Sequence, residues 1–187
     1  MDFEAQQRLT RDLGGDERLL WTGRPRGGVR LVLGDVLMIP FSLMWGGFAI
    51  YWEYSAIHMG APGFFALWGI PFVLVGLYLI FGRFFYDAYR RAHTYYGLTT
   101  DRVLIVSEAL GRKVRSLYLS GLAEMDLAVR TDGTGTITFG TASALTSWMT
   151  GWPGAQRNAA PRFEAIEQAR QVYDQIRAAQ RARPVGA

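Results

Sequence analysis

Two long apolar segments, separated by a short loop, restrict the fold of this chain more than any other feature of its sequence. The first runs from Leu31 to Tyr51 and the second from Phe64 to Phe81. As a helix rising 1.5 Å per residue, the first would extend roughly 32 Å, which matches the ~30 Å hydrocarbon core of a bilayer. The sequence therefore predicts a two-helix transmembrane hairpin in residues 31–86, between an N-terminal segment (1–30) and a folded domain (87–187).

The charged residues that flank the two segments predict the orientation of this hairpin. Arginines lie just before the first segment and just after the second, whereas the loop from Trp52 to Gly63 contains neither Lys nor Arg. The flanking arginines are Arg24, Arg26, Arg30, Arg83, Arg90 and Arg91. Because positively charged flanks stay in the cytoplasm, we expect both termini to be cytoplasmic.

Prolines and glycines inside the segments bear on how the helices pack. Pro40 and Pro71 each remove one backbone donor and bend their helix. Glycines allow two helices to approach closely. The predicted hairpin contains Gly46, Gly47, Gly69, Gly76 and Gly82. We favour packing of the hairpin on itself; the alternative is a kinked pathway or a groove for a partner.

Asp35 is an ionisable residue well inside an apolar segment, where a carboxylate is costly enough to be a functional candidate. It lies four residues after Leu31. At a predicted helix N-terminus, the helix dipole and Arg30 would both favour its negative charge. We therefore interpret Asp35 as an interfacial anchor, with a proton relay as the alternative.

The residue inventory excludes several kinds of chemistry. The sequence has no cysteine, which excludes disulfides, thiolate catalysis and cysteine-bound metals, and its two histidines leave little for a metal site. All but one of the 20 basic residues are arginine, which we attribute to a GC-rich genome and not to nucleic-acid binding. No serine has a histidine candidate beyond His93, and no glycine-rich loop has phosphate-binding spacing. We expect no catalytic residue, cofactor or metal.

Short extended runs dominate residues 94–139 and predict an antiparallel meander. Apolar residues alternate with polar ones, and Asp132 to Gly135 is a hairpin turn. The predicted strands are Thr94 to Leu98, Arg102 to Glu108, Arg112 to Leu119, Leu122 to Arg130 and Thr136 to Phe139. A predicted amphipathic helix follows from Arg162 to about Arg181, and its apolar stripe needs a sheet to cover.

Six motifs along the chain carry a family resemblance. They are GDERLLWTGRP (Gly15 to Pro25), YYGLTTDRVLIV (Tyr95 to Val106), GRKVRSLYLSGL (Gly111 to Leu122), GTITFG (Gly135 to Gly140), Trp152-Pro153-Gly154 and PRFEAIEQARQVYDQI (Pro161 to Ile176). Together they resemble bacterial membrane proteins with a pleckstrin-homology-like (bacterial PH) domain, a family of unknown function. The resemblance implies a mainly β, half-open barrel capped by a C-terminal amphipathic helix, a shape that in some domains binds lipid head groups or peptides.

Four basic residues on two neighbouring predicted strands and their turn are the candidate lipid head-group site. They are Arg102, Arg112, Lys113 and Arg115. Cations gathered beside a membrane attract anionic lipids such as phosphatidylglycerol or cardiolipin. Alternatively, they are solvated residues that keep sheet edges from pairing.

The loop from Thr141 to Ala160 is a second candidate for membrane contact. It contains Trp148 and Trp152 and no charge before Arg157. Tryptophan favours the membrane interface, so this loop would rest on the membrane; alternatively, it folds over one end of the barrel or packs against Trp21.

These features predict a non-catalytic binding or scaffolding module at the cytoplasmic face of the bacterial inner membrane. Its expected partners are the lipid bilayer, with anionic lipids as candidate ligands, and a membrane protein or a second copy, but no nucleic acid. The rival hypothesis is an accessory or assembly subunit of a larger membrane complex, with the transmembrane hairpin as the partner surface.

Overall fold

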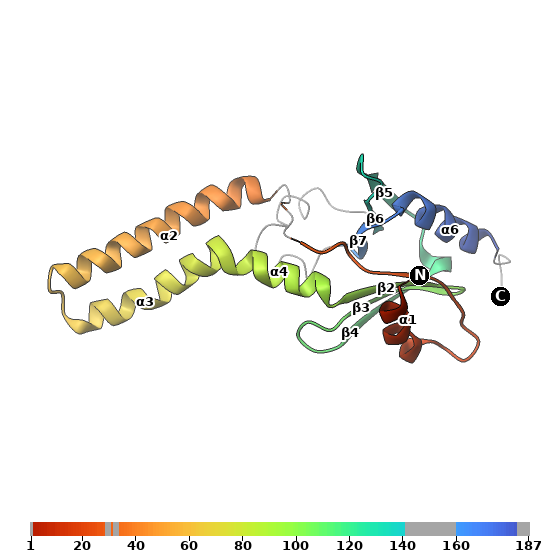
Figure 1. Cartoon of the computed structure of the whole chain (residues 1–187), viewed down its shortest axis with the longest axis horizontal. Coiled ribbons are helices and arrows are strands. Elements are labelled where there is room, and N and C mark those ends of the chain that lie inside the picture. Colours follow the sequence, from red (N-terminus) through yellow and green to blue (C-terminus); the bar gives the residue numbers. More distant parts are fainter. Residues whose placement is uncertain (1, 29–30, 32–33, 141–159, 183–187) are drawn as a thin grey trace. The chain divides into compact units, whose positions relative to one another are not determined.

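The computed structural model describes residues 2–28, 31, 34–140 and 160–182. These residues form two compact units (Figure 1). The helical unit contains residues 31 and 34–87, and the sheet unit contains residues 2–28, 88–140 and 160–182.

The helical unit is a pair of long antiparallel helices, α2 (Asp35–His58) and α3 (Gly63–Leu77), which pack against each other (Figure 1). A π-helical turn (Tyr78–Gly82) connects α3 to α4 (Arg83–Ala92), so one helical run extends from Gly63 to Ala92. Both helical runs are long and apolar enough to cross a membrane.

The first helix extends beyond its predicted end. Trp52 and Glu53, which the sequence analysis placed in the loop, lie inside α2, and only residues 59–62 connect the helices. No glycine or proline interrupts the helix between Tyr51 and Gly60. Gly60 has a φ of 65°, in the left-handed region that favours glycine, and Pro62 stands directly before α3. The predicted loop was therefore too long.

The first sheet of the other unit has four antiparallel strands in the order β1-β2-β3-β4. These are β1 (Leu19–Gly23), β2 (Thr94–Thr99), β3 (Arg102–Ser107) and β4 (Lys113–Tyr118). The last three match predicted strands, whereas β1 comes from the N-terminal residues and pairs with β2. Residues 2–28 thus belong to the same unit as the sheets and do not form a segment of their own, because the outer edge of β2 offers β1 a ladder of hydrogen bonds.

A short N-terminal helix covers one face of this sheet. Helix α1 (Phe3–Leu9) buries Ala5 and Leu9 in a cluster with Leu104, Val106 and Tyr95. Its N-terminus is capped by the Asp2 carboxylate, which accepts hydrogen bonds from two backbone N–H groups and from the Arg24 guanidinium. Burial alone would raise the pKa of Asp2, but these bonds together lower it below its ordinary value.

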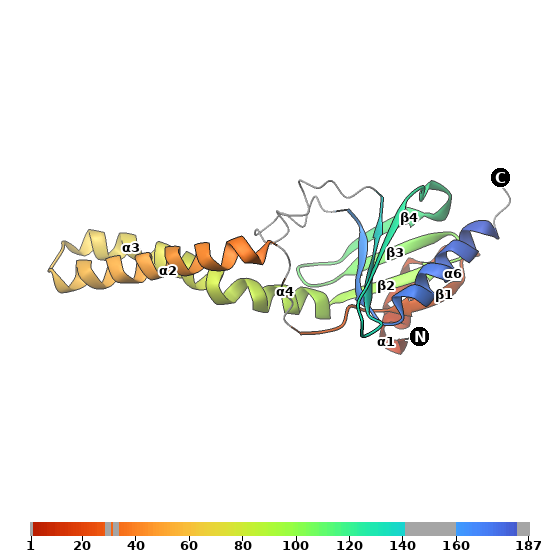
Figure 2. The same cartoon turned by 90° about the horizontal axis from the view of Figure 1, so that it is seen from above.

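The second sheet has the order β5-β6-β7, and its strands run across those of the first (Figure 2). It consists of β5 (Met125–Val129), β6 (Gly135–Phe139) and β7 (Arg162–Ile166), and helix α6 (Ala169–Arg181) follows. The predicted C-terminal helix is therefore correct only from Ala169 onward. Pairing of β7 with β6 overrode the local helical pattern, and the helix begins only after Gln168, which has a φ of 51°.

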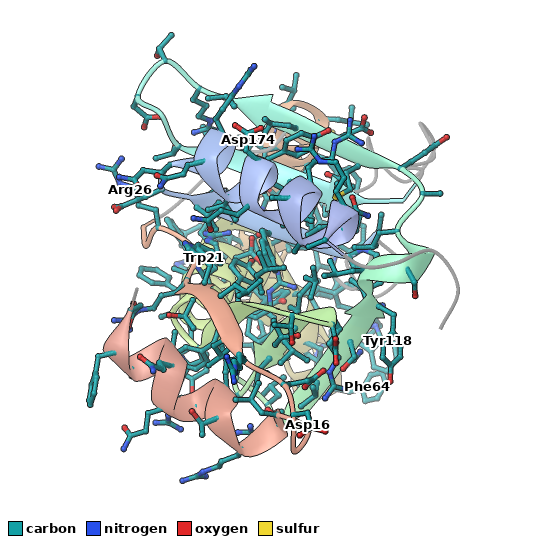
Figure 3. The ribbon with its side chains drawn as sticks, turned by 90° about the vertical axis from the view of Figure 1, so that its right-hand side faces the viewer. Asp16, Trp21, Arg26, Phe64, Tyr118 and Asp174 are labelled. Atoms are coloured by element: carbon teal, nitrogen blue, oxygen red, sulfur yellow. The ribbon has the colours of Figure 1, made fainter. Side chains whose placement is uncertain are left out.

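The main core lies between the two sheets and α6. Phe163 is fully buried at its centre, with ring centroids 5.5 Å from Trp21, 4.6 Å from Tyr96 and 5.1 Å from Phe139. The Tyr96 hydroxyl accepts a hydrogen bond from the backbone N–H of Glu164, and burial raises the pKa of Tyr96. Figure 3 shows α1 and α6 on opposite faces of the first sheet, with Trp21 on the α6 side.

Candidate functional site

Arg102, the first of the four predicted head-group cations, lies at the start of β3 and points to the α1 side of the sheet. Its Nε is 2.8 Å from Oε1 of Glu17, and its Nη2 donates to the Asp12 carbonyl oxygen at 3.0 Å. The hydrogen bond to Glu17 raises the pKa of Arg102. The positive charge of Arg102 is therefore compensated by a carboxylate of the N-terminal region.

Arg112, in the turn between β3 and β4, has similar partners. Its Nη2 is 2.6 Å from Oδ2 of Asp12, its Nη1 pairs with Glu108, and Nη2 also donates to the Arg8 carbonyl. Glu108 in turn accepts from Arg8 of α1 at 2.6 Å. Arg102 and Arg112 thus fasten the N-terminal residues to the β3–β4 hairpin.

Lys113 and Arg115 lie on the other face of the first sheet, because side chains alternate along a strand. In register, Lys113 is opposite Ser107 and Arg115 is opposite Ile105, which packs against the main core. Lys113 is exposed and Arg115 is half-buried. The structure therefore brings the four cations together in two pairs on opposite faces and not in one patch.

Strand alternation in the sequence places Lys113 and Arg115 on one face of β4, but only the register of β4 with β3 shows that Arg102 lies on the opposite face. The partners of Arg102 and Arg112 had no comparable signal, since Asp12 and Glu17 are distant in sequence and meet them only in the folded unit. Trp148 and Trp152 of the other candidate site lie outside the described residues.

Asp35 has a partner that the sequence analysis did not identify. Its Oδ1 is 2.6 Å from Nη1 of Arg83, and both side chains are buried, with exposed fractions of 6% and 9%. The Arg83 guanidinium also lies over the Phe84 ring, 4.3 Å from its centroid. Asp35 thus contributes to a buried ion pair between the first turn of α2 and the start of α4, and Arg30, its predicted partner, lies outside the described residues.

The glycines of the helix pair mark its contact surface. A Cβ on Gly76 would be 2.8 Å from the Cα of Gly46, so the two backbones touch there. A Cβ on Gly69 would collide with Glu53 and Trp52 of α2. Gly47, by contrast, has nothing within 4 Å. These contacts favour packing of the helix pair on itself, and they leave Gly46, Gly69 and Gly76 out of any surface for a further partner.

Titratable side chains form no metal cluster in the part of the chain that the structure describes. Several charged side chains among those residues form ion pairs with each other. Arg24 pairs with Asp2 and Glu4, Arg26 pairs with Asp132, and Arg162 pairs with Glu164. This arrangement stabilises the sheet unit and its N-terminal helix.

Comparison with known proteins supports the architecture. A family model described as Bacterial PH domain matches residues 31–180, which include both long helices, strands β2 to β7 and nearly all of α6. No curated protein and no solved structure matches the chain. The match covers far more than half of the sequence and confirms the resemblance found in its motifs. The chain therefore belongs to the bacterial PH domain family.

Proposed function

We propose that this protein is a non-catalytic binding or scaffolding module that α2 and α3 anchor in the bacterial inner membrane, with its sheet unit on the cytoplasmic side. Membership of the bacterial PH domain family supports a non-enzymatic binding module, and the two long apolar helices support a membrane anchor. The proposal assigns the transmembrane hairpin to residues 31–86 and the PH-like domain to residues 87–187 together with the N-terminal residues that complete its first sheet.

The surface of the helix pair carries this proposal. Small residues occupy the inner side of α2, among them Ser42, Gly46 and Ala49, whereas large apolar side chains such as Leu43 and Phe48 are exposed. A water-soluble helix pair would have the opposite distribution, because extended apolar patches are unstable in water. In a bilayer, lipid tails would cover these side chains, and small residues between the helices would allow close packing.

The pairing of β1 with β2 supports the placement of both ends of the anchor on one side. Gly23 at the end of β1 pairs with Tyr96 of β2, and neighbouring strands lie ~4.8 Å apart. The chain therefore leaves the first sheet for the helix pair and returns from it at neighbouring strands. This connection requires an even number of membrane crossings, and the flanking arginines assign the shared side to the cytoplasm.

Lys113 and Arg115, which share one face of the first sheet, remain our candidates for binding anionic head groups. Basic residues near an anionic surface contribute about 1 kcal/mol each, so two of them suffice only for a domain already held at the membrane. Membrane contact through Trp148 and Trp152 stays a prediction from the sequence.

Reporter fusions test the proposed topology. Alkaline phosphatase, which is active only outside the cytoplasm, should be active when inserted at Gly60 and silent when fused after Ala187. A fluorescent protein that folds only in the cytoplasm should give the reverse pattern and serves as the matched control. Active phosphatase after Ala187, or recovery of the untagged protein in the soluble fraction, would refute the proposal.

A further inference from the structure

We infer that the tip of the β3–β4 hairpin, residues 108–112, inserts Leu110 into the head-group layer of an anionic membrane, and that Lys113 binds anionic head groups beside it. This inference rests on the proposed function, since it requires α2 and α3 to hold the protein in that membrane. It adds a contact surface and an apolar contact residue to the proposed module.

The first observation is the exposure of Leu110. Its side chain is 80% exposed, although it is a large apolar residue on a tight hairpin. Gly111 follows with a φ of 89°, a left-handed conformation that lets the chain turn directly after Leu110. Ser107 and Lys113 pair at the base of the hairpin. The tip is thus a short, well-defined turn whose apolar side chain has no packing role in the sheet unit.

The second observation is that the base of the tip is bonded to the end of helix α4. The backbone N–H of Glu108 donates to the His93 carbonyl oxygen at 2.8 Å, and the Thr94 hydroxyl donates to the Arg90 carbonyl at 2.8 Å. His93 comes directly after α4, and the helical run that ends there begins at Gly63. These bonds hold the tip beside the residues where the proposed membrane helix ends.

The chemistry of the tip favours an anionic lipid surface over a protein partner. Lys113 is exposed beside the apolar tip, and an apolar side chain next to a basic one is the usual pattern of interfacial membrane contact. The charge of Arg112 is compensated by Asp12 and Glu108. Replacement of Lys113 therefore tests whether a positive charge beside the tip contributes to membrane contact.

The absence of cysteine from the sequence allows a direct test in the full-length protein. Single cysteines replace Leu110, Tyr118 or Phe48, each labelled with the environment-sensitive fluorophore NBD, in nanodiscs of phosphatidylglycerol that contain a head-group-region quencher lipid. Tyr118, 60% exposed at the opposite end of β4 (Figure 3), is the matched control, and Phe48, 66% exposed on α2, reports on membrane insertion.

The expected result is a blue-shifted, quenched label at residue 110, at least twofold more quenched than the label at residue 118. A lipid that carries its quencher in the acyl chain should quench the label at residue 48. If it does, but the labels at residues 110 and 118 are equally weakly quenched, the inference is overturned while the proposed function stands. Lack of quenching at residue 48 would refute the proposed function as well. A blue shift at residue 110 that depends on protein concentration and not on the quencher lipid would indicate a second copy at the tip and also overturn the inference.

A second comparison tests the charge. In phosphatidylglycerol nanodiscs, Lys113→Ser should reduce the quenching at residue 110 at least twofold, and in phosphatidylcholine nanodiscs it should have no effect. The same loss in both lipids, or no loss in either, would remove Lys113 from the proposed contact.

Discussion

Removing either partner of the buried Asp35–Arg83 ion pair should strongly destabilise the helix pair. The two side chains are 2.6 Å apart and almost fully buried. In Asp35→Leu the Arg83 guanidinium would stay buried without its carboxylate, which typically costs about 3–5 kcal/mol. Against a total stability of about 5–15 kcal/mol, this loss should shift the unfolding midpoint visibly, and Arg83→Leu should have an effect of similar size.

The double variants distinguish the pair from two separate contributions. Asp35→Leu combined with Arg83→Leu removes both charges and their desolvation cost, so its stability should equal that of wild type or exceed it by about 1–4 kcal/mol. The exchange of Asp35→Arg with Arg83→Asp should recover only part of the loss. It places a positive charge in the first turn of α2, where the helix dipole disfavours it by about 0.3–1 kcal/mol.

Unfolding of the full-length protein in mixed micelles, by SDS titration with circular dichroism, measures these differences. The wild type, both single variants and the double leucine variant form a double-mutant cycle, whose coupling energy should exceed about 2 kcal/mol. A double variant as unstable as the sum of the two single ones would refute the reasoning, because the two residues would then act independently.

The remaining predictions concern packing and pH. Gly76→Leu should separate the helices, because a Cβ there would lie 2.8 Å from the backbone of α2, while Gly47→Leu, with nothing within 4 Å, should leave the SDS midpoint unchanged; equal midpoints would contradict the packing. Phe163→Ala should cost about 3–5 kcal/mol in thermal unfolding of the sheet unit, whereas Phe3→Ala, at an exposed side chain, should change it by less than about 0.5 kcal/mol. The pKa of Asp2 is lowered, so its contribution to α1 docking is complete above about pH 4 and is lost as the pH falls through the depressed value. The protection of α1 amides against hydrogen exchange, taken relative to the intrinsic exchange rate at each pH, should therefore fall at low pH in wild type but not in Asp2→Asn, and an equal fall in both would assign the effect to another group.

The candidate site was predictable only in part, and the reason differs between its residues. Lys113 and Arg115 could be placed on one face of a strand, because alternation is a property of the local backbone. The compensation of Arg102 by Glu17 could not be found in this way, since these residues are 85 positions apart and meet only when β1 and α1 join the sheet. Leu110 carried no signal at all, because only its exposure on a tight turn distinguishes it from a core leucine.

The sequence by itself determined the two long apolar helices, strands β2 to β4 and the family, because run length, periodicity and motifs are properties of contiguous residues. Tertiary structure decided β1 and β7, whose residues become strands only by pairing with the open edges of β2 and β6. It also decided the partner of Asp35, which lies 48 residues away on a separate helix. In each case the stabilising partner is distant along the chain, and a local pattern contains no information about which distant group will occupy the neighbouring position.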